Sequence, residues 1–269
     1  MTGQTKWWIG RCALLMAAVF TVSNTAYAQA PAQAFDRRSN EIRFQLDFQV
    51  PAAALAALLP PGFTSDVSAA GPAKDCNLRV IFIDEVAING PDNRPIGRGT
   101  NQLVYLTAPV KDASGASAQL VVGGLTADAS AAPGPYGNYL PATTHTMTRH
   151  IAAPASGEGP VMETQDWVFR TASGEHLEMH IEFQRGGANY RPEYRRVFYS
   201  AKDAGMVRVS HEQLVLDILR NTTTTPPDHV KTFSFSGGGG SYARLFDGTE
   251  KVLSWDSISK AYSNPIIFL

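Results

Sequence analysis

The chain has 269 residues, of which 44% are hydrophobic and 17% charged, and its formal net charge at pH 7 is −1. This balance argues against nucleic acid as a partner and gives no cue for a charged membrane surface. Two cysteines, Cys12 and Cys76, are too few for a disulfide framework, and the length suits one large β domain or an α/β domain.

Residues 1–28 have the pattern of a secretory signal peptide. Lys6 and Arg11 precede an apolar run at 13–22, and residues 26–28 read Ala-Tyr-Ala, a small-x-small cleavage site. An uncleaved anchor is disfavoured because the run is short, and no later run is long enough to span a bilayer. We therefore predict a periplasmic or secreted protein whose mature chain, residues 29–269, forms a single domain. Its net charge is −3, because residues 1–28 hold two of the 23 Lys and Arg and none of the 24 Asp and Glu.

The first half of the mature chain predicts strands separated by turns. After a polar lead-in at 30–39, residues 42–48 alternate apolar and polar side chains, which predicts a first strand. Pro51 suits the first position of a short Ala- and Leu-rich helix, which ends before two prolines at 60 and 61. Further strands are predicted at 78–83, 101–110, 118–126, 143–151 and 161–171, with a loop rich in Gly, Pro and Tyr at 127–141.

The clearest strand signal lies between glycines at residues 174–187. Four apolar residues alternate with polar ones there: Leu177, Met179, Ile181 and Phe183. A period of two gives one apolar face and one titratable face, which carries His176, Glu178 and His180. The titratable face is either the wet outside of a sheet or the lining of a polar cavity, and the functional interpretation depends on this choice.

The last third of the chain is less uniform. Residues 206–219 fit either a capped helix or two strand pieces with a bulge. Four glycines at 237–240 predict a hairpin or a closely packed β crossing, and residues 255–262 predict a short helix. Strands with frequent turns predict a mainly β fold, an antiparallel barrel or sandwich with one or two short helices.

Several common catalytic signatures are missing from the sequence, including Gly-x-Ser-x-Gly, the phosphate-binding Gly-x-x-x-x-Gly-Lys and Cys-x-x-Cys. A metal site at His176, Glu178 and His180 is limited by strand geometry. Alternate positions lie ~6.6 Å apart and the two histidines ~13 Å apart, so one ion could join only a neighbouring pair. A solvated face with charges of both signs explains the pattern better. We therefore predict no metal and no cofactor.

The order of several segments resembles the acetoacetate decarboxylase-like superfamily. These segments are residues 44–63 with their Leu-Pro-Pro-Gly-Phe ending, the strands 78–83 and 103–110, and Gly-Asn-Tyr-Leu-Pro at 137–141, Arg-Pro-Glu-Tyr at 191–194 and Ala-Arg-Leu-Phe at 243–246. The resemblance covers most of the mature chain, and the order of elements carries it rather than one motif. It implies a closed barrel or cone with a mostly enclosed interior pocket.

The resemblance also implies a lysine after the loop proline, which in the decarboxylases forms a Schiff base with a keto acid. Here Ala142 follows Pro141, and no lysine lies between Lys111 and Lys202. The acidic residue of the family is likewise replaced, around residues 100 and 101. We therefore do not expect Schiff-base decarboxylation.

Two functional classes remain open. The first, which we favour, is a lyase-like enzyme acting on a small keto acid or apolar carbonyl compound. The second is a non-catalytic secreted barrel that binds a small molecule. A carbohydrate-binding module is weaker, because only two tryptophans remain after cleavage. The predicted partner is a small molecule, with no nucleic acid and no membrane after cleavage, and a homo-oligomer stays open.

The first class needs acid, base and carboxylate-binding groups. Arg149 offers a fork of donors that matches a carboxylate, although a surface arginine fits equally well. Tyr136 and Tyr139 could rim a pocket or pack a loop over the barrel mouth. The predicted site is therefore Glu178, His180 and His145 as catalytic groups, with Arg149, Tyr136 and Tyr139 at the substrate. Inward-facing Glu178 and His180 would favour chemistry, and outward-facing ones a simple barrel.

Overall fold

The computed structural model describes residues 33–132, 136–203, 205–222, 228–263 and 266–268. The predicted signal peptide lies outside the described residues. From residue 31 onward the chain forms one compact unit. Within the described part, no helix combines the length and the apolar character needed to cross a bilayer.

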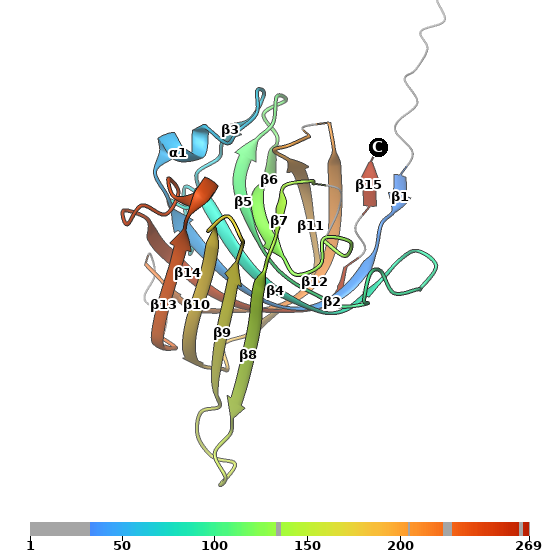
Figure 1. Cartoon of the computed structure of the whole chain (residues 1–269). Coiled ribbons are helices and arrows are strands. Elements are labelled where there is room, and N and C mark those ends of the chain that lie inside the picture. The colour runs from blue at the N-terminus through green and yellow to red at the C-terminus, as the bar shows by residue number, and fades with distance from the viewer. Residues whose placement is uncertain (1–32, 133–135, 204, 223–227, 264–265, 269) are drawn as a thin grey trace, which may run out of the picture. The chain divides into compact units, whose positions relative to one another are not determined.

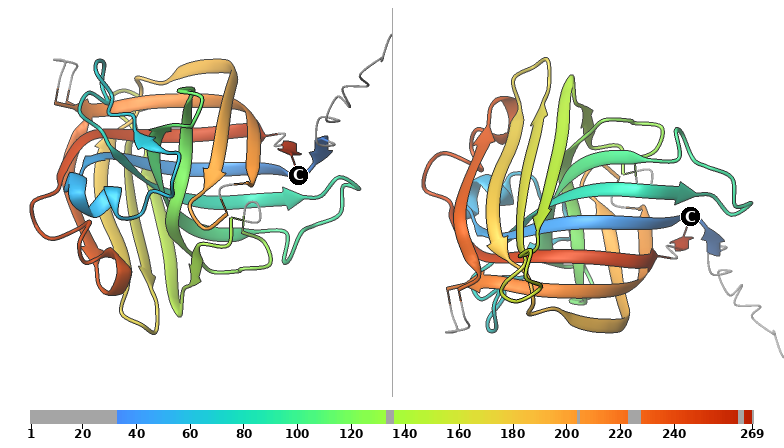
Figure 2. Two further views of the ribbon diagram at one scale, coloured as in Figure 1. Left: turned by 90° about the horizontal axis from the view of Figure 1, so that it is seen from above. Right: turned by 90° about the horizontal axis from the view of Figure 1, so that it is seen from below.

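Among the described residues, seven strands form a closed ring (Figures 1 and 2). They are β2 (Arg38–Gln49), β4 (Leu78–Asn89), β5 (Asn101–Lys111), β6 (Ser117–Thr126), β11 (Asn189–Ser200), β12 (Val207–Asn221) and β14 (Lys251–Ser263). The order is β12–β11–β6–β5–β4–β2–β14, and β14 pairs again with β12. Neighbours are antiparallel except β11 and β6. Closing the ring leaves its seven members without a free edge.

A second, four-stranded antiparallel sheet packs on the outside of the ring (Figure 1). In the order β13–β10–β9–β8, it consists of β13 (Val230–Gly238), β10 (His176–Gln184), β9 (Met162–Arg170) and β8 (Thr144–Ala152). Three shorter pairings extend the ring: β1 (Gln33–Phe35) with β15 (Ile266–Phe268), β3 (Thr64–Ser65) with β5, and β7 (Tyr139–Pro141) with β6. The helical elements are α1 (Ala52–Ala56) and the single-turn η1 (Gly240–Tyr242).

The main apolar core lies between the ring and the four-stranded sheet. Ring residues such as Phe44, Phe48 and Phe82 are fully buried there against residues of the sheet. The ring centroids of Phe82 and Trp167 are 5.7 Å apart, and those of Phe48 and Phe235 are 4.9 Å apart. Aromatic pairs at such spacings bury large apolar areas and hold the two layers together.

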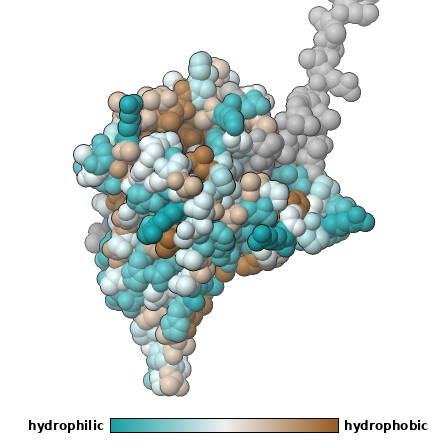
Figure 3. All heavy atoms as spheres, in the orientation of Figure 1, coloured by the Kyte–Doolittle hydropathy of each residue, from teal (hydrophilic) through white to brown (hydrophobic). Residues whose placement is uncertain are grey.

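Neither face of β10 lines the interior of the ring. Leu177, Met179, Ile181 and Phe183 are buried in the core between the sheet and the ring. The alternate residues, including Glu178 and His180, are half-buried on the opposite face of the sheet. Figure 3 shows hydrophilic side chains over this side of the molecule. The titratable face predicted from the alternation is therefore the outer face of a sheet.

The prediction of an antiparallel barrel with one or two short helices is confirmed, but two local predictions are wrong. Residues 255–262 are part of strand β14, which pairs with β2 on one edge and β12 on the other. The polar lead-in at 30–39 already contains β1 and the start of β2, and the Arg37 side chain in it is fully buried. Of the two alternatives for residues 206–219, the strand is observed, with register shifts in β12.

The glycine run at 237–240 is a close crossing of two chain segments, as predicted. Gly239 has a φ of +74°, and a Cβ there would overlap the backbone carbonyl of Gly174. Gly248 has a similar φ of +91°, but a Cβ there would meet nothing within 4 Å. The two positions share the backbone requirement and differ in the space available.

We expect Gly239→Ala to lower the free energy of unfolding by about 3 kcal/mol, because the new methyl group forces the two segments apart. Gly248→Ala is the matched control, for which we expect about 1 kcal/mol from the backbone conformation alone. Urea unfolding of the two variants measures the difference. Equal losses would show that the crossing tolerates a side chain.

Candidate functional site

One end of the ring encloses a small charged cavity. The volume in which the centre of a water molecule fits is about 20 Å³, so the cavity has room for about one water. Its polar lining consists of Glu41, Arg43, Glu85, Tyr105, Tyr136, Tyr139, Arg208, Ser210, Glu212 and Lys260. These residues come from β2, β4, β5, β7, β12 and β14 and from the loop before β7, so the closed ring assembles the site from the whole length of the chain.

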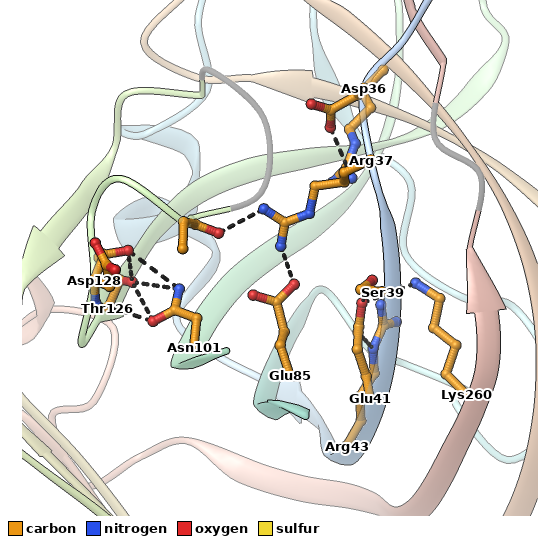
Figure 4. A network of polar contacts seen from close by, with 12 residues as sticks. Asp36, Arg37, Ser39, Glu41, Arg43, Glu85, Asn101, Thr126, Asp128 and Lys260 are labelled. Carbon is orange, nitrogen blue, oxygen red and sulfur yellow. Dashed lines mark hydrogen bonds and ion pairs between the residues drawn. The ribbon is translucent and has the colours of Figure 1, made fainter. Parts of the chain in front are cut away.

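Two cations and two carboxylates alternate in this cavity, and Figure 4 shows three of the four side chains, Glu41, Arg43 and Lys260. Lys260 Nζ lies 3.0 Å from Glu212 Oε1 and 3.3 Å from Glu41 Oε1. Arg43 donates to both carboxylates as well, from Nε to Glu41 Oε2 at 2.5 Å and from Nη2 to Glu212 Oε1 at 3.3 Å. All four side chains are 6% exposed or less. We call Glu41, Arg43, Glu212 and Lys260 the charge square.

The charge square sets the protonation of its own members. Burial raises the pKa of Glu41 and Glu212, but the charges of Arg43 and Lys260 outweigh burial and hold both pKa values well below the ordinary range. Burial, followed by the neighbouring Arg43, lowers the pKa of Lys260, and the two carboxylates oppose that shift. The carboxylates of the square are therefore ionised and poor proton acceptors.

Glu85 is the carboxyl group of the cavity that titrates near neutrality. Burial raises its pKa to about 7, with a further rise from the charge of Glu41, and Arg37 opposes the shift. The Arg37 guanidinium binds Glu85 Oε1 and donates to the backbone oxygen of Ala131 at 2.6 Å (Figure 4). A carboxyl group with such a pKa can both give and take a proton at physiological pH.

The buried polar atoms of the lining that have no hydrogen-bond partner within the described part of the chain include Glu85 Oε2, Tyr139 Oη, Ser210 Oγ and Glu212 Oε2. A buried polar group without a partner costs about 1–3 kcal/mol. Several in one cavity indicate that water or a polar ligand normally supplies the missing contacts.

Of the six predicted site residues, the structure brings Tyr136 and Tyr139 to the cavity. Their ring centroids are 6.4 Å apart, and both rings contact the small apolar cluster that includes Ile83 and Phe198. Burial raises the pKa of Tyr136 to about 12, so its hydroxyl stays a hydrogen-bond donor.

The other four predicted residues lie outside the cavity, which corrects their assignment to an interior site. Glu178 pairs with Arg170 at 2.6 Å, and His180 Nδ1 lies 2.7 Å from Asp166 Oδ1, both on the outer face of the sheet. The physical reason is that the apolar face of β10 is needed to cover the ring. Arg149 is already held by Glu163, which accepts from its Nε at 2.6 Å and from its Nη2 at 3.1 Å.

His145 lies in a different place from His180. It is on β8, separated from β10 by β9, and its Nδ1 is 3.4 Å from Gln102 Oε1. It lines a shallow surface pocket of about 160 Å³ together with Asp84 and Asp128. In the described residues, no group of three His, Cys, Asp or Glu side chains is placed to hold a metal ion.

Asn101 stands where the resemblance implied that an acidic residue is replaced. Asn101 is buried and bonds Thr126 Oγ1 at 3.1 Å and the backbone oxygen of Asp128 at 3.3 Å (Figure 4). It supplies no charge. Glu85, which lies opposite Asn101 in the β4–β5 register, carries the carboxyl group of the cavity whose pKa is about 7.

Comparisons with known proteins give structural neighbours only. No protein-family model matches the chain, and no curated protein matches its sequence. A solved acetoacetate decarboxylase from Legionella pneumophila aligns over 96% of this chain and 97% of its own, with a TM-score of 0.51 and 10% identity.

Two further solved structures align with TM-scores below 0.5. An acetoacetate decarboxylase-like enzyme from Sphingomonas wittichii RW1 covers 93% of this chain and 97% of its own, at a TM-score of 0.49 and 13% identity. The enduracididine biosynthesis enzyme MppR, complexed with pyruvate, covers 95% of this chain and 96% of its own, at 0.47 and 11%.

The chain is thus a closed β-ring with a sheet packed on its outside and a charged cavity inside. More particularly, it has the acetoacetate decarboxylase-like fold, as the order of its segments predicted. At this level of identity the likeness shows the fold alone, so the chemistry has to be argued from the cavity.

We expect Lys260→Met to lower the free energy of unfolding by about 3–5 kcal/mol, because it leaves Glu41 and Glu212 buried with one cation between them. Lys251→Met, on the exposed end of the same strand, is the control and should change stability by no more than about 0.5 kcal/mol. Urea unfolding measures both. A small loss for Lys260→Met would mean that the square does not depend on its ammonium group.

Proposed function

We propose that the protein is exported and that its ring interior binds a small keto acid or related carbonyl compound for lyase-related acid–base chemistry. The pattern of residues 1–28 supports export. The observation that carries the rest is the cavity itself, in which unpartnered polar atoms, a carboxyl group that titrates near neutrality and two buried cations converge.

Charge balance favours a ligand with one carboxylate. The groups that line the cavity or pair with its lining are four carboxylates and four cations: Asp36, Glu41, Glu85, Glu212, Arg37, Arg43, Arg208 and Lys260. They sum to zero when every group is charged. Protonation of Glu85 leaves one positive charge in excess, and a single anionic group of the ligand neutralises it.

The polar donors of the cavity suit a carbonyl oxygen. Tyr139 Oη and Ser210 Oγ are buried and have no partner among the described residues, so each can donate to an oxygen atom of a ligand. Because the cavity has room for about one water, a keto acid must displace this water and shift lining side chains. The fit therefore favours compounds of a few carbon atoms.

The chemistry that this arrangement supports is proton transfer at the carbon next to a carbonyl. Ionised Glu85 removes the proton, the electron pair moves to the carbonyl oxygen, and the hydroxyl groups and buried cations stabilise the resulting enolate. Return of the proton completes an exchange cycle. The same enolate is the first intermediate of many carbon–carbon and carbon–oxygen bond cleavages.

Deuterium exchange at the methyl group of pyruvate, followed by NMR in heavy water, tests this proposal. We expect the wild-type protein to accelerate exchange, with a rate that rises with pH above about 7, because the base must be ionised and the bound anion raises its pKa further. Glu85→Gln should lower the rate about 100-fold or more. Glu178→Gln, on the outer face of the sheet, is the matched control and should leave the rate unchanged.

The second candidate function is a non-catalytic barrel that binds a small molecule. It is favoured by the charge square, whose cations and carboxylates neutralise one another and whose carboxylates are poor proton acceptors. Saturable binding of pyruvate without any accelerated exchange would establish this candidate. Loss of exchange in Glu178→Gln but not in Glu85→Gln would move the chemistry to the outer sheet.

Lys260 is the one amine that the structure places in the cavity lining, and it defines a further test. Imine formation needs a neutral amine, which the lowered pKa of Lys260 favours. The contacts of Nζ with Glu41 and Glu212, at 3.3 and 3.0 Å, oppose this and hold the group as an ammonium ion between two carboxylates. We therefore propose that Lys260 acts through its charge and forms no covalent bond. Borohydride added with acetoacetate should leave the intact mass unchanged relative to borohydride alone. A reduced adduct mapped to Lys260 would overturn this point and restore a Schiff-base route from a new position.

A further inference from the structure

A groove on the outer wall of the ring contains a buried carboxylate that nothing in the described chain neutralises. The groove lies between the end of β10 with its following loop and the strands β12 and β14, and its volume is about 310 Å³. Asp217 of β12 lines it and is 7% exposed. A site of this volume is within the range that small organic ligands occupy.

The two oxygens of Asp217 are in different situations. Oδ2 accepts from the backbone N–H groups of Gly186 and Gly187 at 3.3 and 3.2 Å. Oδ1 is buried and has no hydrogen-bond partner within the described residues. A Cβ at Gly187 would lie 2.8 Å from Oδ1, so the glycine permits the close approach of the carboxylate. The loop fixes one oxygen and leaves the other free for a donor.

The neighbouring charges do not satisfy Asp217. Arg185, the cation that lines the groove, lies with its Nε 3.2 Å from Glu163 Oε2, and Glu163 also holds Arg149. Within the described part of the chain, no ion pair includes Asp217. The carboxylate is therefore complementary to a positively charged donor from outside the chain.

The rest of the groove is partly hydroxylic and partly apolar. Ser257 lies directly opposite Asp217 in the β12–β14 register, and Ser259 lies opposite Val215. Val215 is 38% exposed, which is unusual for a large apolar side chain, and Phe183 forms part of the wall. A ligand that suits both parts carries a donor group at one end and a short hydrocarbon chain at the other.

We propose that this groove is a binding site for a small aliphatic primary amine. The ammonium group donates to Asp217 Oδ1 and to the Ser257 hydroxyl, and the alkyl chain lies on Val215 and Phe183. The site is separate from the ring interior and does not depend on the function proposed for it.

Titration of the purified protein with n-butylammonium chloride, followed by NMR chemical shifts, tests the proposal. We expect saturable binding to the wild type and at least about tenfold weaker binding to Asp217→Asn, which keeps an oxygen for the loop amides but loses the charge. The neutral probe 1-butanol should bind the wild type about tenfold more weakly than the ammonium ion. Asp247→Asn, an exposed carboxylate elsewhere, should bind like the wild type.

Val215→Lys keeps the proposal testable if Asp217→Asn does not fold. Its exposed position tolerates a longer side chain, and its ammonium group should occupy the groove and abolish binding of the probe. Equal binding to the wild type and to Asp217→Asn or Val215→Lys would overturn the proposal. Absence of saturable binding to the wild type would also overturn it and show that the groove holds water only.

Discussion

The structure depends on burying both faces of β2. Phe44, Leu46 and Phe48 face the core between the ring and the outer sheet, while Glu41 and Arg43 face the interior. A strand buried on both faces is ordinarily apolar throughout. Because one face of β2 is charged, the ring can close only if other strands bring opposite charges to the same level, as Glu212 on β12 and Lys260 on β14 do.

This requirement also specifies how the strands pair. Lys260 lies opposite Glu41 in the β14–β2 register. A slip of β14 by one residue would turn Lys260 to the outer wall and leave two interior carboxylates, Glu41 and Glu212, without its charge. Removing one partner from a buried pair costs about 3–5 kcal/mol, a large share of the stability of a typical domain. We infer that the charge square selects the register more than it adds to stability.

Most strands could be predicted from the sequence, but most residues of the candidate site could not. Strict alternation at 42–48 and 176–184 marked strands, because side-chain direction in a strand has a period of two. The interior position of Lys260 could not be predicted, because residues 255–262 mix Ser, Ile and Trp at spacings that fit a helix as well as a strand. Pairing with β2 and β12 makes the segment a strand. Burial of Glu41, Arg43 and Glu212 could not be predicted, because an alternating strand normally leaves its polar face wet. The same default correctly describes β10, whose Glu178 and His180 lie on the outer face of its sheet.

Charge neutrality in the interior links ligand binding to protonation. With every group ionised the cavity has no net charge. An anionic ligand that binds without a proton would therefore add an uncompensated charge to an interior of low dielectric constant. Glu85, whose pKa is about 7, is the group that can take up the compensating proton. By linkage, an anion in the cavity raises the proton affinity of Glu85 as much as the proton raises the affinity for the anion. A bound ligand carboxylate would therefore raise the pKa of Glu85, and proton removal by ionised Glu85 would then need a higher pH than the ligand-free protein needs.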